Sequence, residues 1–360
     1  MNKETTVKPL GYVSGLDGLR AFAILLVMLS HANFQFFQNG GIGVPVFFAL
    51  SGFLITTLLL EEFKKYNKIE FKAFYIRRTF RLFPALYCML LFTFLYALFF
   101  NSKMYDDIVT EIIAAGLYVY NLSWVWNIKQ VMLYHTWSLG VEEQFYLIWP
   151  ILLFIFLKYN SIKWLSILLT IFILFIGINE TFVLFNNSGI SIVNSITNES
   201  IFMGCLVAIL RWKGMILFKI PSWIAFLSII SIFLLGMFPH DTFNSFFEKR
   251  TPGVFALLII LYLIRDKNDL LSKIFTNKLS VFIGKISYSL YLWHLPVFKV
   301  FSFDSSLPSL VSFFGKFIVS LLFALLSWFL LEKKAITYGH KWSKKIISID
   351  TSKNEVIAKQ

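Results

Sequence analysis

The sequence predicts an all-α integral membrane protein with about ten transmembrane helices and with both termini in the cytoplasm. Two observations predict this class. Hydrophobic residues make up 58% of the 360 residues and charged residues only 15%, whereas charged residues are about a quarter of a typical soluble domain. The apolar residues also fall in blocks of about 17 to 25, the length at which a helix crosses a hydrocarbon core of about 30 Å.

Ten apolar blocks fit a membrane span. In chain order they cover residues 16–34, 44–61, 82–100, 139–157, 163–180, 200–212, 221–238, 252–265, 280–299 and 309–331. The stretch 108–126 is moderately apolar but carries Glu111 and Asn121, and we interpret it as an outer loop or a re-entrant helix; as a span it would be an eleventh. No small-residue cleavage motif follows the first block, so we expect a retained span rather than a signal peptide.

The charge of the loops predicts the orientation. With ten spans and a cytoplasmic N-terminus, the cytoplasmic segments are each rich in Lys or Arg, as the positive-inside rule requires. These segments are 61–81, 158–164, 211–219, 265–278 and the tail from residue 332. An eleventh span at 108–126 would place Arg77, Arg78 and Arg81 outside. The exceptions on the outer side are Lys103, Lys129, Lys249 and Arg250.

Composition also limits the partners. The net charge of +13 comes from Lys and Arg in the loops between apolar blocks, so we expect membrane lipids as neighbours and no nucleic acid. Cys88 and Cys205 lie inside apolar segments, so neither a disulfide framework nor a cysteine metal site is indicated, and we expect no metal. We divide the chain into a transmembrane domain, 1–335, and a polar cytoplasmic tail, 336–360. The oligomeric state stays open.

The first group of candidate site residues is Asp17, Arg20 and His31, in GLDGLRAFAILLVMLSHANF. At about 100° per residue, Arg20 and His31 are separated by three turns plus about 20°, so they share one helix face about 16 Å apart. Asp17 precedes Arg20 by one turn, so an ion pair along the helix partly neutralises the cation. Ionisable side chains inside spans suggest a functional site. The alternative is a snorkelling Arg20 and an interfacial His31.

The second group is the pair Glu142 and Glu143, in the segment HTWSLGVEEQFY. Two carboxylates at a helix start can simply be stabilised by the helix dipole. The functional interpretation is that one carboxylate points into the bundle, where burial tunes its basicity or lets it orient a histidine. Adjacent helix positions diverge by about 100°, so we predict that one of the pair, Glu142, takes this role.

The third group is the basic cluster Arg77, Arg78 and Arg81, in FYIRRTFRLFP at the cytoplasmic start of the 82–100 span. As an anchor to anionic lipid such a cluster is ordinary. Three guanidinium groups beside a membrane pathway would also suit the phosphates of a nucleotide-bearing donor such as acyl-CoA, which arginine binds bidentately. Both interpretations stay open on the sequence alone.

The fourth group lies in GKISYSLYLWHLP. Ser287, Tyr291 and His294 follow the spacing of a single helix face, and Pro296 leaves the backbone carbonyl of Leu292 without its helical partner. A polar stripe inside a span results. Its alternative is a hydrogen-bond network internal to the helix bundle.

Taken together and in this order, five segments resemble the acyltransferase-3 family of membrane O-acyltransferases. They are the stretch from Asp17 to His31, GVPVFFALSGFLIT at 43–56, FYIRRTFRLFP at 74–84, TWSLGVEEQFYLIWP at 136–150 and ISYSLYLWHLP at 286–296. The resemblance covers residues 12–335, almost the whole chain. No nucleophile elbow, Walker loop, Gly-x-Gly-x-x-Gly or His-Glu-x-x-His motif occurs, so serine-hydrolase, ATP-driven and zinc-protease chemistries lack support.

The resemblance implies a ten-span domain in the bacterial cytoplasmic membrane that transfers an acyl group, often acetyl from acetyl-CoA. The acceptors in this family are hydroxyls of O-antigen, exopolysaccharide, peptidoglycan, nodulation factors or macrolides. For this chain the resemblance implies acyl-CoA as donor substrate, no bound cofactor, and a cell-surface carbohydrate as acceptor, free or lipid-linked.

The residue groups and the resemblance together predict a site. Arg20 and His31 match the family's pair of Arg and His separated by ten residues, and Glu142 matches the acidic position after Trp-Ser-Leu. We predict four catalytic residues, namely Arg20, His31, Glu142 and His294. We predict substrate binding by Asp17, Arg77, Arg78, Arg81, Trp137, Ser287 and Tyr291.

Two departures limit the transfer from the family. Pro45 stands where many members carry Asp in a Gly-Val-Asp-x-Phe-Phe motif, so no role of that Asp can be assigned. We also find no extracytoplasmic hydrolase-like domain of the kind fused to many members. We therefore expect the membrane domain to complete the transfer or to pass the acyl group to a separate protein.

The mechanism we favour makes His31 or His294 the general base that deprotonates a sugar hydroxyl, a role typically worth about 10² to 10⁴ in rate. Arg20 positions the donor or stabilises developing negative charge, and an acyl-enzyme through Tyr291 or Ser287 is an alternative route. The rival class is a transporter of a polar or lipid-linked carbohydrate, because buried His, Glu and Arg also suit a proton-coupled carrier. A purely structural membrane subunit is the third interpretation.

Overall fold

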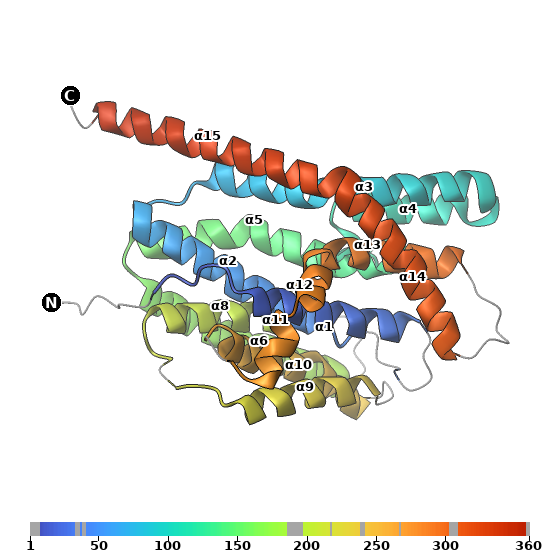
Figure 1. The fold of residues 1–360 in the computed structure, drawn as a ribbon, viewed down its shortest axis with the longest axis horizontal. Helices are drawn as coiled ribbons and strands as arrows, with labels where there is room; N and C mark the ends of the chain where they lie inside the picture. The colour runs from blue at the N-terminus through green and yellow to red at the C-terminus, as the bar shows by residue number, and fades with distance from the viewer. Residues whose placement is uncertain are drawn as a thin grey trace.

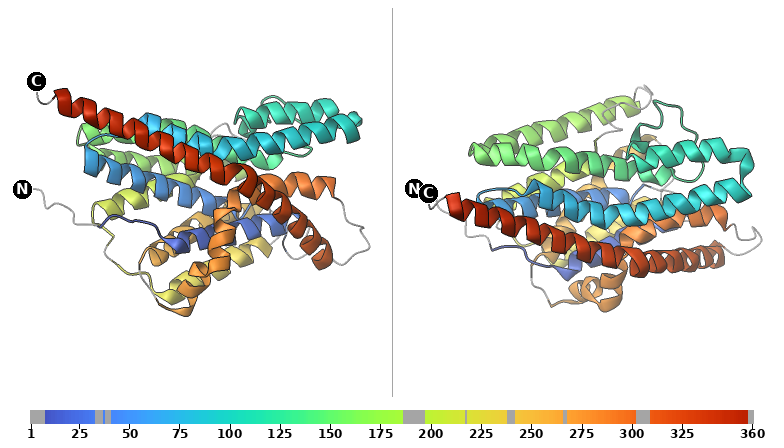
Figure 2. Two further views of the ribbon diagram at one scale, coloured as in Figure 1. Left: turned by 45° about the horizontal axis from the view of Figure 1, so that its top comes forward. Right: turned by 90° about the horizontal axis from the view of Figure 1, so that it is seen from above.

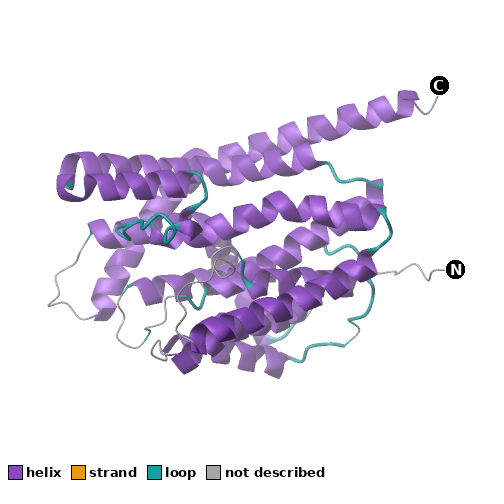
Figure 3. Cartoon of the chain, turned by 180° about the vertical axis from the view of Figure 1, so that it is seen from behind, coloured by secondary structure: helices purple, strands orange, loops and turns teal. Residues whose placement is uncertain are grey.

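The computed structural model describes residues 8–32, 37, 41–185, 197–216, 218–237, 242–265, 268–301 and 309–357. Within these residues every regular element is helical (Figure 3). The all-α class predicted from the sequence is confirmed. The longer helices lie side by side in an elongated bundle, crossed by the short helix α12 (Lys278–Lys285) (Figures 1 and 2).

Six helical stretches of the described chain are long and apolar enough to cross a membrane. They include α1 (Ser14–His31), α2 (Val44–Tyr66), α3 (Phe71–Phe100), α5 (Trp137–Lys158), α6 (Ile162–Phe185) and α14 (Ser309–Ser327). The helices α9 (Ser222–Met237) and α10 (Thr242–Leu263) contain two shorter apolar stretches. This content agrees with the predicted membrane protein, because such helices satisfy their backbone polar groups internally.

The remaining helices are shorter or polar. They are α4 (Tyr105–Gly116), α8 (Glu199–Trp212), α11 (Leu270–Thr276), α12, α13 (Ser287–Val300) and α15 (Lys333–Ile357), with one-turn 3-10 helices at Ser102–Met104, Tyr120–Leu122 and Tyr134–Thr136. The helix α4, which overlaps the first part of the stretch 108–126 that was ambiguous in the sequence, has 12 residues, which rise about 18 Å. That is well short of the hydrocarbon core.

Two predicted segments have more structure than the sequence indicated. The span predicted at 280–299 is divided at Ile286, where α12 ends and α13 begins; α12 runs across the bundle and α13 along it (Figure 1). The predicted tail is helical from Lys333 to Ile357. A π-helical turn, Trp328–Glu332, joins α14 to α15, and such turns change the direction of a helix by inserting a residue.

Small residues bring α2 and α8 into close contact. A Cβ atom added at Gly52 would lie 1.9 Å from the carbonyl oxygen of Ile201, and one added at Gly204 would lie 2.5 Å from that of Ala49. Helices in membranes associate through such close backbone approach, because lipid offers no hydrophobic drive between them. The two glycines therefore set the spacing of this helix pair.

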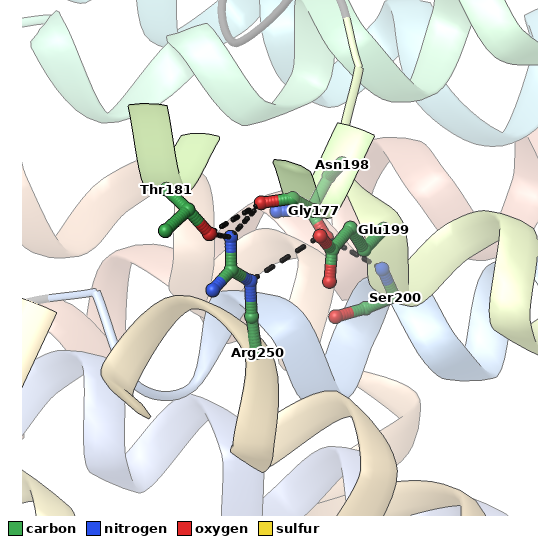
Figure 4. Close-up of polar contacts among 6 residues, drawn as sticks. All are labelled: Gly177, Thr181, Asn198, Glu199, Ser200 and Arg250. Atoms are coloured by element: carbon green, nitrogen blue, oxygen red, sulfur yellow. Dashed lines mark hydrogen bonds and ion pairs between the residues drawn. The ribbon is translucent and has the colours of Figure 1, made fainter. Parts of the chain in front are cut away.

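A buried ion pair joins α6, α8 and α10 (Figure 4). Arg250 Nε lies 3.3 Å from Glu199 Oε1, and the side chains of the pair are 15% and 5% exposed. The same guanidinium donates to Thr181 Oγ1 at 2.8 Å and to the carbonyl of Gly177. Burial makes each charge dependent on the other, since an unpaired charge in an apolar interior is costly.

The ends of several helices collect at one end of the bundle. The C-terminal ends of α2, α5 and α8 and the far end of α15 lie at the left in Figure 1, and α15 runs alongside α3 toward that end (Figures 1 and 2). The short helix α4 packs on α3 at the opposite end. The Lys- and Arg-rich connections predicted to be cytoplasmic between α2 and α3 and between α5 and α6 are therefore at the same end.

Candidate active site

A cavity of about 210 Å³ lies between α1, α2, α3, α5 and α13. Six of the residues predicted from the sequence line it: Arg20, Arg78, Arg81, Glu142, Ser287 and Tyr291. Polar residues that were not predicted from the sequence also line it, among them Ser51, Ser138, Tyr146 and Tyr288. The predicted residues come from four of the five sequence segments on which the resemblance rests, and Ser51 comes from the fifth. All five segments therefore meet at the cavity.

One wall of the cavity is cationic. Arg78 Nη2 donates to Glu143 Oε1 at 3.1 Å, and its guanidinium carbon lies 3.3 Å from the centroid of the Tyr146 ring. A guanidinium stacked on an aromatic face keeps its charge and its planar set of donors in a fixed orientation. Arg81 lines the same wall. The two guanidinium groups, of which Arg78 is fixed by these contacts, give this wall the chemistry of an anion-binding surface.

Arg20 extends from α1 into the cavity and is held in place by Asp17. Its Nη1 lies 2.7 Å from Asp17 Oδ1, which confirms the ion pair predicted from their spacing. The hydroxyl of Tyr12 donates to the other Asp17 oxygen at 2.8 Å. Burial, followed by the Asp17 carboxylate, raises the pKa of Tyr12 to about 12, so its hydroxyl stays a donor at neutral pH. Asp17 thus positions Arg20 and does not itself line the cavity.

The two adjacent glutamates have different partners. Glu142 lines the cavity and accepts a hydrogen bond from Ser51 Oγ at 2.8 Å. Glu143 instead pairs with Arg78. The divergence of neighbouring helix positions, about 100°, accounts for this difference. Glu142 has the carboxylate that faces the cavity.

Tyr291 connects the cavity to a group of histidines. Tyr291 lines the cavity. Its hydroxyl lies 2.6 Å from Ser138 Oγ and donates to the backbone carbonyl of His135 at 2.6 Å. With that proton committed, Ser138 is the donor to the Tyr291 oxygen. The ring of Tyr291 lies 5.6 Å from that of His294 by centroids. The polar stripe predicted on one face of this helix therefore runs from the cavity to the histidines.

His31 and His294 face each other. His294 Nδ1 lies 2.6 Å from the carbonyl of Tyr291 and must donate to it, so His294 Nε2 is an acceptor. His31 Nδ1 lies 3.2 Å from that Nε2 and 3.0 Å from the carbonyl of Val27, so it carries the proton. These assignments follow from the partners, since each neutral imidazole has one donor and one acceptor nitrogen. They leave His31 Nε2 unprotonated, the form required of a general base.

His135 is a third histidine of this group, and no role was predicted for it from the sequence. Its ring lies 5.1 Å from that of His294, and its Nε2 lies 3.2 Å from the carbonyl of Leu292. That carbonyl is the one left free by Pro296. In the sequence, this free carbonyl was the signal that could have predicted such a contact, because a buried acceptor without a helical partner requires a donor from elsewhere.

The other predicted residues lie farther from the cavity. Arg77 Nη2 lies 3.9 Å from Glu62 Oε2 at the end of α2, and Trp137 packs edge-to-face on Phe48 at 6.1 Å. Neither lines the cavity. Among the described residues, no group of three or more His, Cys, Asp or Glu side chains is arranged to hold a metal ion.

Comparison with known proteins identifies the family of this chain. A family model described as an acyltransferase domain matches residues 13–333. The chain therefore belongs to the acyltransferase-3 family, as the resemblance implied.

Three relatives show the extent of the similarity. A protein of Staphylococcus aureus strain COL named "Putative O-acetyltransferase SACOL0978" is 34% identical over 92% of this chain and 59% of its own length. The peptidoglycan O-acetyltransferase OatA of Listeria monocytogenes is 33% identical over 82% of this chain and 51% of its own length. The O-acetyltransferase OatA of Staphylococcus aureus is 32% identical over 79% and 50%. The chain thus spans about half the length of these relatives, and no solved structure matches it.

Proposed function

We propose that this chain is a membrane O-acyltransferase that moves an acetyl or other short acyl group from acyl-CoA to a hydroxyl of a cell-envelope carbohydrate. The family supports the acyltransferase class, and the relative named a peptidoglycan O-acetyltransferase supports a glycan acceptor. The observation that carries the proposal is the link through Tyr291, which lines the arginine cavity and contacts His294, the partner of His31.

The donor in this proposal binds by its phosphates. Arg78 and Arg81 present guanidinium groups in one wall of the cavity, and arginine matches phosphate geometry with two parallel hydrogen bonds. Arg20 lines the same cavity and lies on α1, the helix that carries His31. In the proposal it positions the donor in the cavity.

A single base, His31, is sufficient for the transfer step. The acceptor hydroxyl gives its proton to His31 Nε2 as its oxygen attacks the thioester carbonyl. The tetrahedral intermediate then collapses, the carbon–sulfur bond breaks, and the departing thiolate takes the proton back from His31. The products are an O-acyl ester and free CoA. His294 holds His31 in the required tautomer, which is the role of the third group in a nucleophile–base arrangement.

Two further roles complete the proposal. Glu142 and Ser287 contact the donor in the cavity. Asp17 holds Arg20, and Trp137 packs on Phe48, which lines the cavity. An acyl group held on Tyr291 or Ser287 is the alternative to direct transfer. In that route the hydroxyl of the tyrosine or serine attacks the thioester first, the carbon–sulfur bond breaks, and the CoA thiolate leaves with the hydroxyl proton. The sugar hydroxyl then attacks the resulting ester, and its proton returns to the oxygen of the tyrosine or serine as that oxygen leaves.

We also propose the arrangement in the membrane. The chain crosses the bacterial cytoplasmic membrane ten times with both termini inside, as a transmembrane domain at 1–335 and a polar cytoplasmic segment at 336–360. Arg- and Lys-rich connections at one end of the bundle support this orientation. Acyl-CoA then enters from the cytoplasm, and the carbohydrate acceptor, free or lipid-linked, approaches from the His31 side.

The test uses the purified full chain in nanodiscs with acetyl-CoA as donor and peptidoglycan glycan strands as acceptor. Release of free thiol and formation of acetyl ester are measured for wild type, His31→Ala, Arg20→Ala and the combined alanine variant of Arg78 and Arg81. We expect His31→Ala to lower the rate by about 10² to 10⁴ and the arginine variants to weaken donor use.

Two outcomes would overturn the proposal. A His31→Ala protein of normal abundance that transfers acetyl within a few-fold of wild type would exclude His31 as the base. Folded wild type without acetyl-CoA turnover, combined with proton-gradient-dependent export of a glycan in vesicles, would instead establish the transporter interpretation.

A further inference from the structure

Glu111 is a fully buried carboxylate that the proposed mechanism does not use. It lies in α4, where its exposed fraction is 0%, while Asp107 one turn earlier is exposed enough to pair with Lys129 at the surface. A buried charge survives only when its oxygens are satisfied. Its partners therefore indicate what it holds in place.

All four partners of Glu111 are donors. Its Oε1 accepts from Tyr120 Oη at 2.6 Å and from the backbone N–H of Val131 at 2.9 Å. Its Oε2 accepts from the N–H groups of Met132 at 2.7 Å and Leu133 at 3.2 Å. Four donors at two oxygens is the bonding of an ionised carboxylate, which has acceptor sites only.

The Tyr120 hydroxyl stays protonated at neutral pH and so remains a hydrogen-bond donor. Burial, followed by the neighbouring Glu111 carboxylate, raises the pKa of Tyr120 above its ordinary value. Burial also raises the pKa of Glu111, and its four hydrogen bonds oppose that rise. The cluster is therefore held together by donors that do not titrate near pH 7.

The three backbone groups bound by Glu111 lead directly into the histidine group. Leu133 is followed by Tyr134 and His135, which begin the 3-10 turn Tyr134–Thr136. The Tyr134 ring lies edge-on to His31 at 5.7 Å, and the His135 ring lies 5.1 Å from His294. The carbonyl of His135 also accepts the Tyr291 hydroxyl at 2.6 Å. One carboxylate thus fixes the backbone that supports both His31 and His294.

We infer that Glu111 is a positioning residue for acyl transfer, acting through the N–H groups of Val131, Met132 and Leu133 to hold Tyr134 and His135 against the His31–His294 pair. This inference rests on the proposed function. It predicts an effect on the chemical step and not on donor binding, because the Glu111 contacts lie on the histidine side and Glu111 is outside the arginine cavity. Misplacement of a catalytic group by about 1 Å can cost about 10²-fold in rate.

The chain offers a matched control. The ion pair of Asp107 with Lys129, 2.8 Å long, links the same helix to the same segment, but its side chains are 36% and 62% exposed. Exposed pairs of this kind contribute little to stability. Asp107→Asn therefore tests whether any loss of contact between α4 and this segment lowers activity. Glu111→Gln tests the buried carboxylate and its hydrogen bonds.

The experiment compares wild type, Glu111→Gln, Tyr120→Phe and Asp107→Asn in nanodiscs, with acetyl-CoA and peptidoglycan glycan strands. For Glu111→Gln we expect kcat to fall about 10²-fold with the donor KM within two-fold of wild type. For Tyr120→Phe, which keeps the three N–H contacts, we expect a loss below ten-fold. Asp107→Asn should keep both constants within two-fold.

Amide hydrogen exchange supplies a readout that does not depend on activity. In Glu111→Gln the amides of residues 131–133 should exchange at least ten-fold faster, while peptides of the α2 and α8 pair stay protected. Normal kcat in Glu111→Gln, or a loss of kcat together with faster exchange throughout the bundle, would overturn the positioning role. Wild type without acetyl transfer would refute the proposed function, and exchange at 131–133 would still report on the Glu111 contacts.

Discussion

Individual charged residues of one motif have different surroundings. In the segment FYIRRTFRLFP, Arg78 and Arg81 line the cavity, whereas Arg77 faces Glu62 at the end of α2. A basic motif that the sequence treats as a unit is therefore divided by the fold. Single substitutions of Arg77 and Arg81 can measure this difference in role.

Arg81→Ala should raise the KM for acetyl-CoA by at least ten-fold, because a guanidinium contact to a phosphate is worth about 1.5 to 3 kcal/mol. Arg77→Ala should leave that KM within about two-fold, since it removes only a partly exposed ion pair. Thiol release at varied acetyl-CoA concentration measures both. Equal effects of the two substitutions would contradict the division.

Two of the cations that break the positive-inside rule are paired. Arg250 pairs with the buried Glu199, and Lys129 pairs with Asp107. The positive-inside rule counts Lys and Arg with little contribution from Asp and Glu, so pairing gives these two cations a local counter-charge but leaves them exceptions to the rule.

Glu199→Gln should lower the free energy of unfolding by about 3 to 5 kcal/mol, because it leaves the buried Arg250 guanidinium without its counter-charge. The double variant Glu199→Gln with Arg250→Met should recover much of that loss, since no unpaired charge remains. Denaturation in detergent, followed by tryptophan fluorescence, measures the three proteins. A double variant less stable than the sum of the single changes would contradict the account.

At the scale of elements, a single predicted span became two helices with different tasks. The helix α12 packs on α1, where a Cβ atom at Gly284 would lie 1.8 Å from the Asp17 carbonyl oxygen. The helix α13 then carries Ser287, Tyr291 and His294 along the cavity. Hydropathy averages over a window and therefore did not detect the break at Ile286. The spacing of the polar residues within α13 did predict their common face.

The α2 and α8 pair provides a test of close helix packing. Gly52→Ala should destabilise the protein by about 1 to 3 kcal/mol, because the new methyl group would meet the Ile201 carbonyl oxygen in a packed interface. Gly116→Ala is the matched change, since its Cβ would have an ordinary contact of 3.4 Å with Leu90. Gly116→Ala should leave the midpoint of thermal denaturation unchanged, and the same assay measures both variants. Equal midpoints for both variants would show that the glycines do not set the helix spacing.

At the scale of the whole molecule, the orientation in the membrane can be tested directly. With Cys88 and Cys205 replaced by serine, Lys65→Cys at the end of α2 should react with a membrane-impermeant maleimide only after cells are permeabilised. Lys103→Cys, at the α3–α4 connection, should react in intact cells. Both side chains are exposed, so labelling reports the side of the membrane. The reverse pattern would invert the proposed topology.

The whole bundle also decides which distant residues become neighbours. His31 and His294 are separated by 263 positions and lie 3.2 Å apart, while Tyr291 and His135 are separated by 156 positions and share a hydrogen bond. No spacing rule links residues at such separations. The sequence could name both histidines of the pair by their motifs but could not predict their contact.

The sequence by itself determined the helical membrane class, the Asp17–Arg20 ion pair, the common face of Ser287, Tyr291 and His294, and the free carbonyl of Leu292. Each of these follows from composition or from the fixed 3.6-residue turn of a helix, which acts between near neighbours. The sequence also predicted Glu142 as the inward carboxylate, whereas tertiary packing alone decided that Glu143 pairs with Arg78 and that Glu111 binds the backbone before His135. Those contacts depend on how helices pack across the bundle, and packing is set by many side chains together.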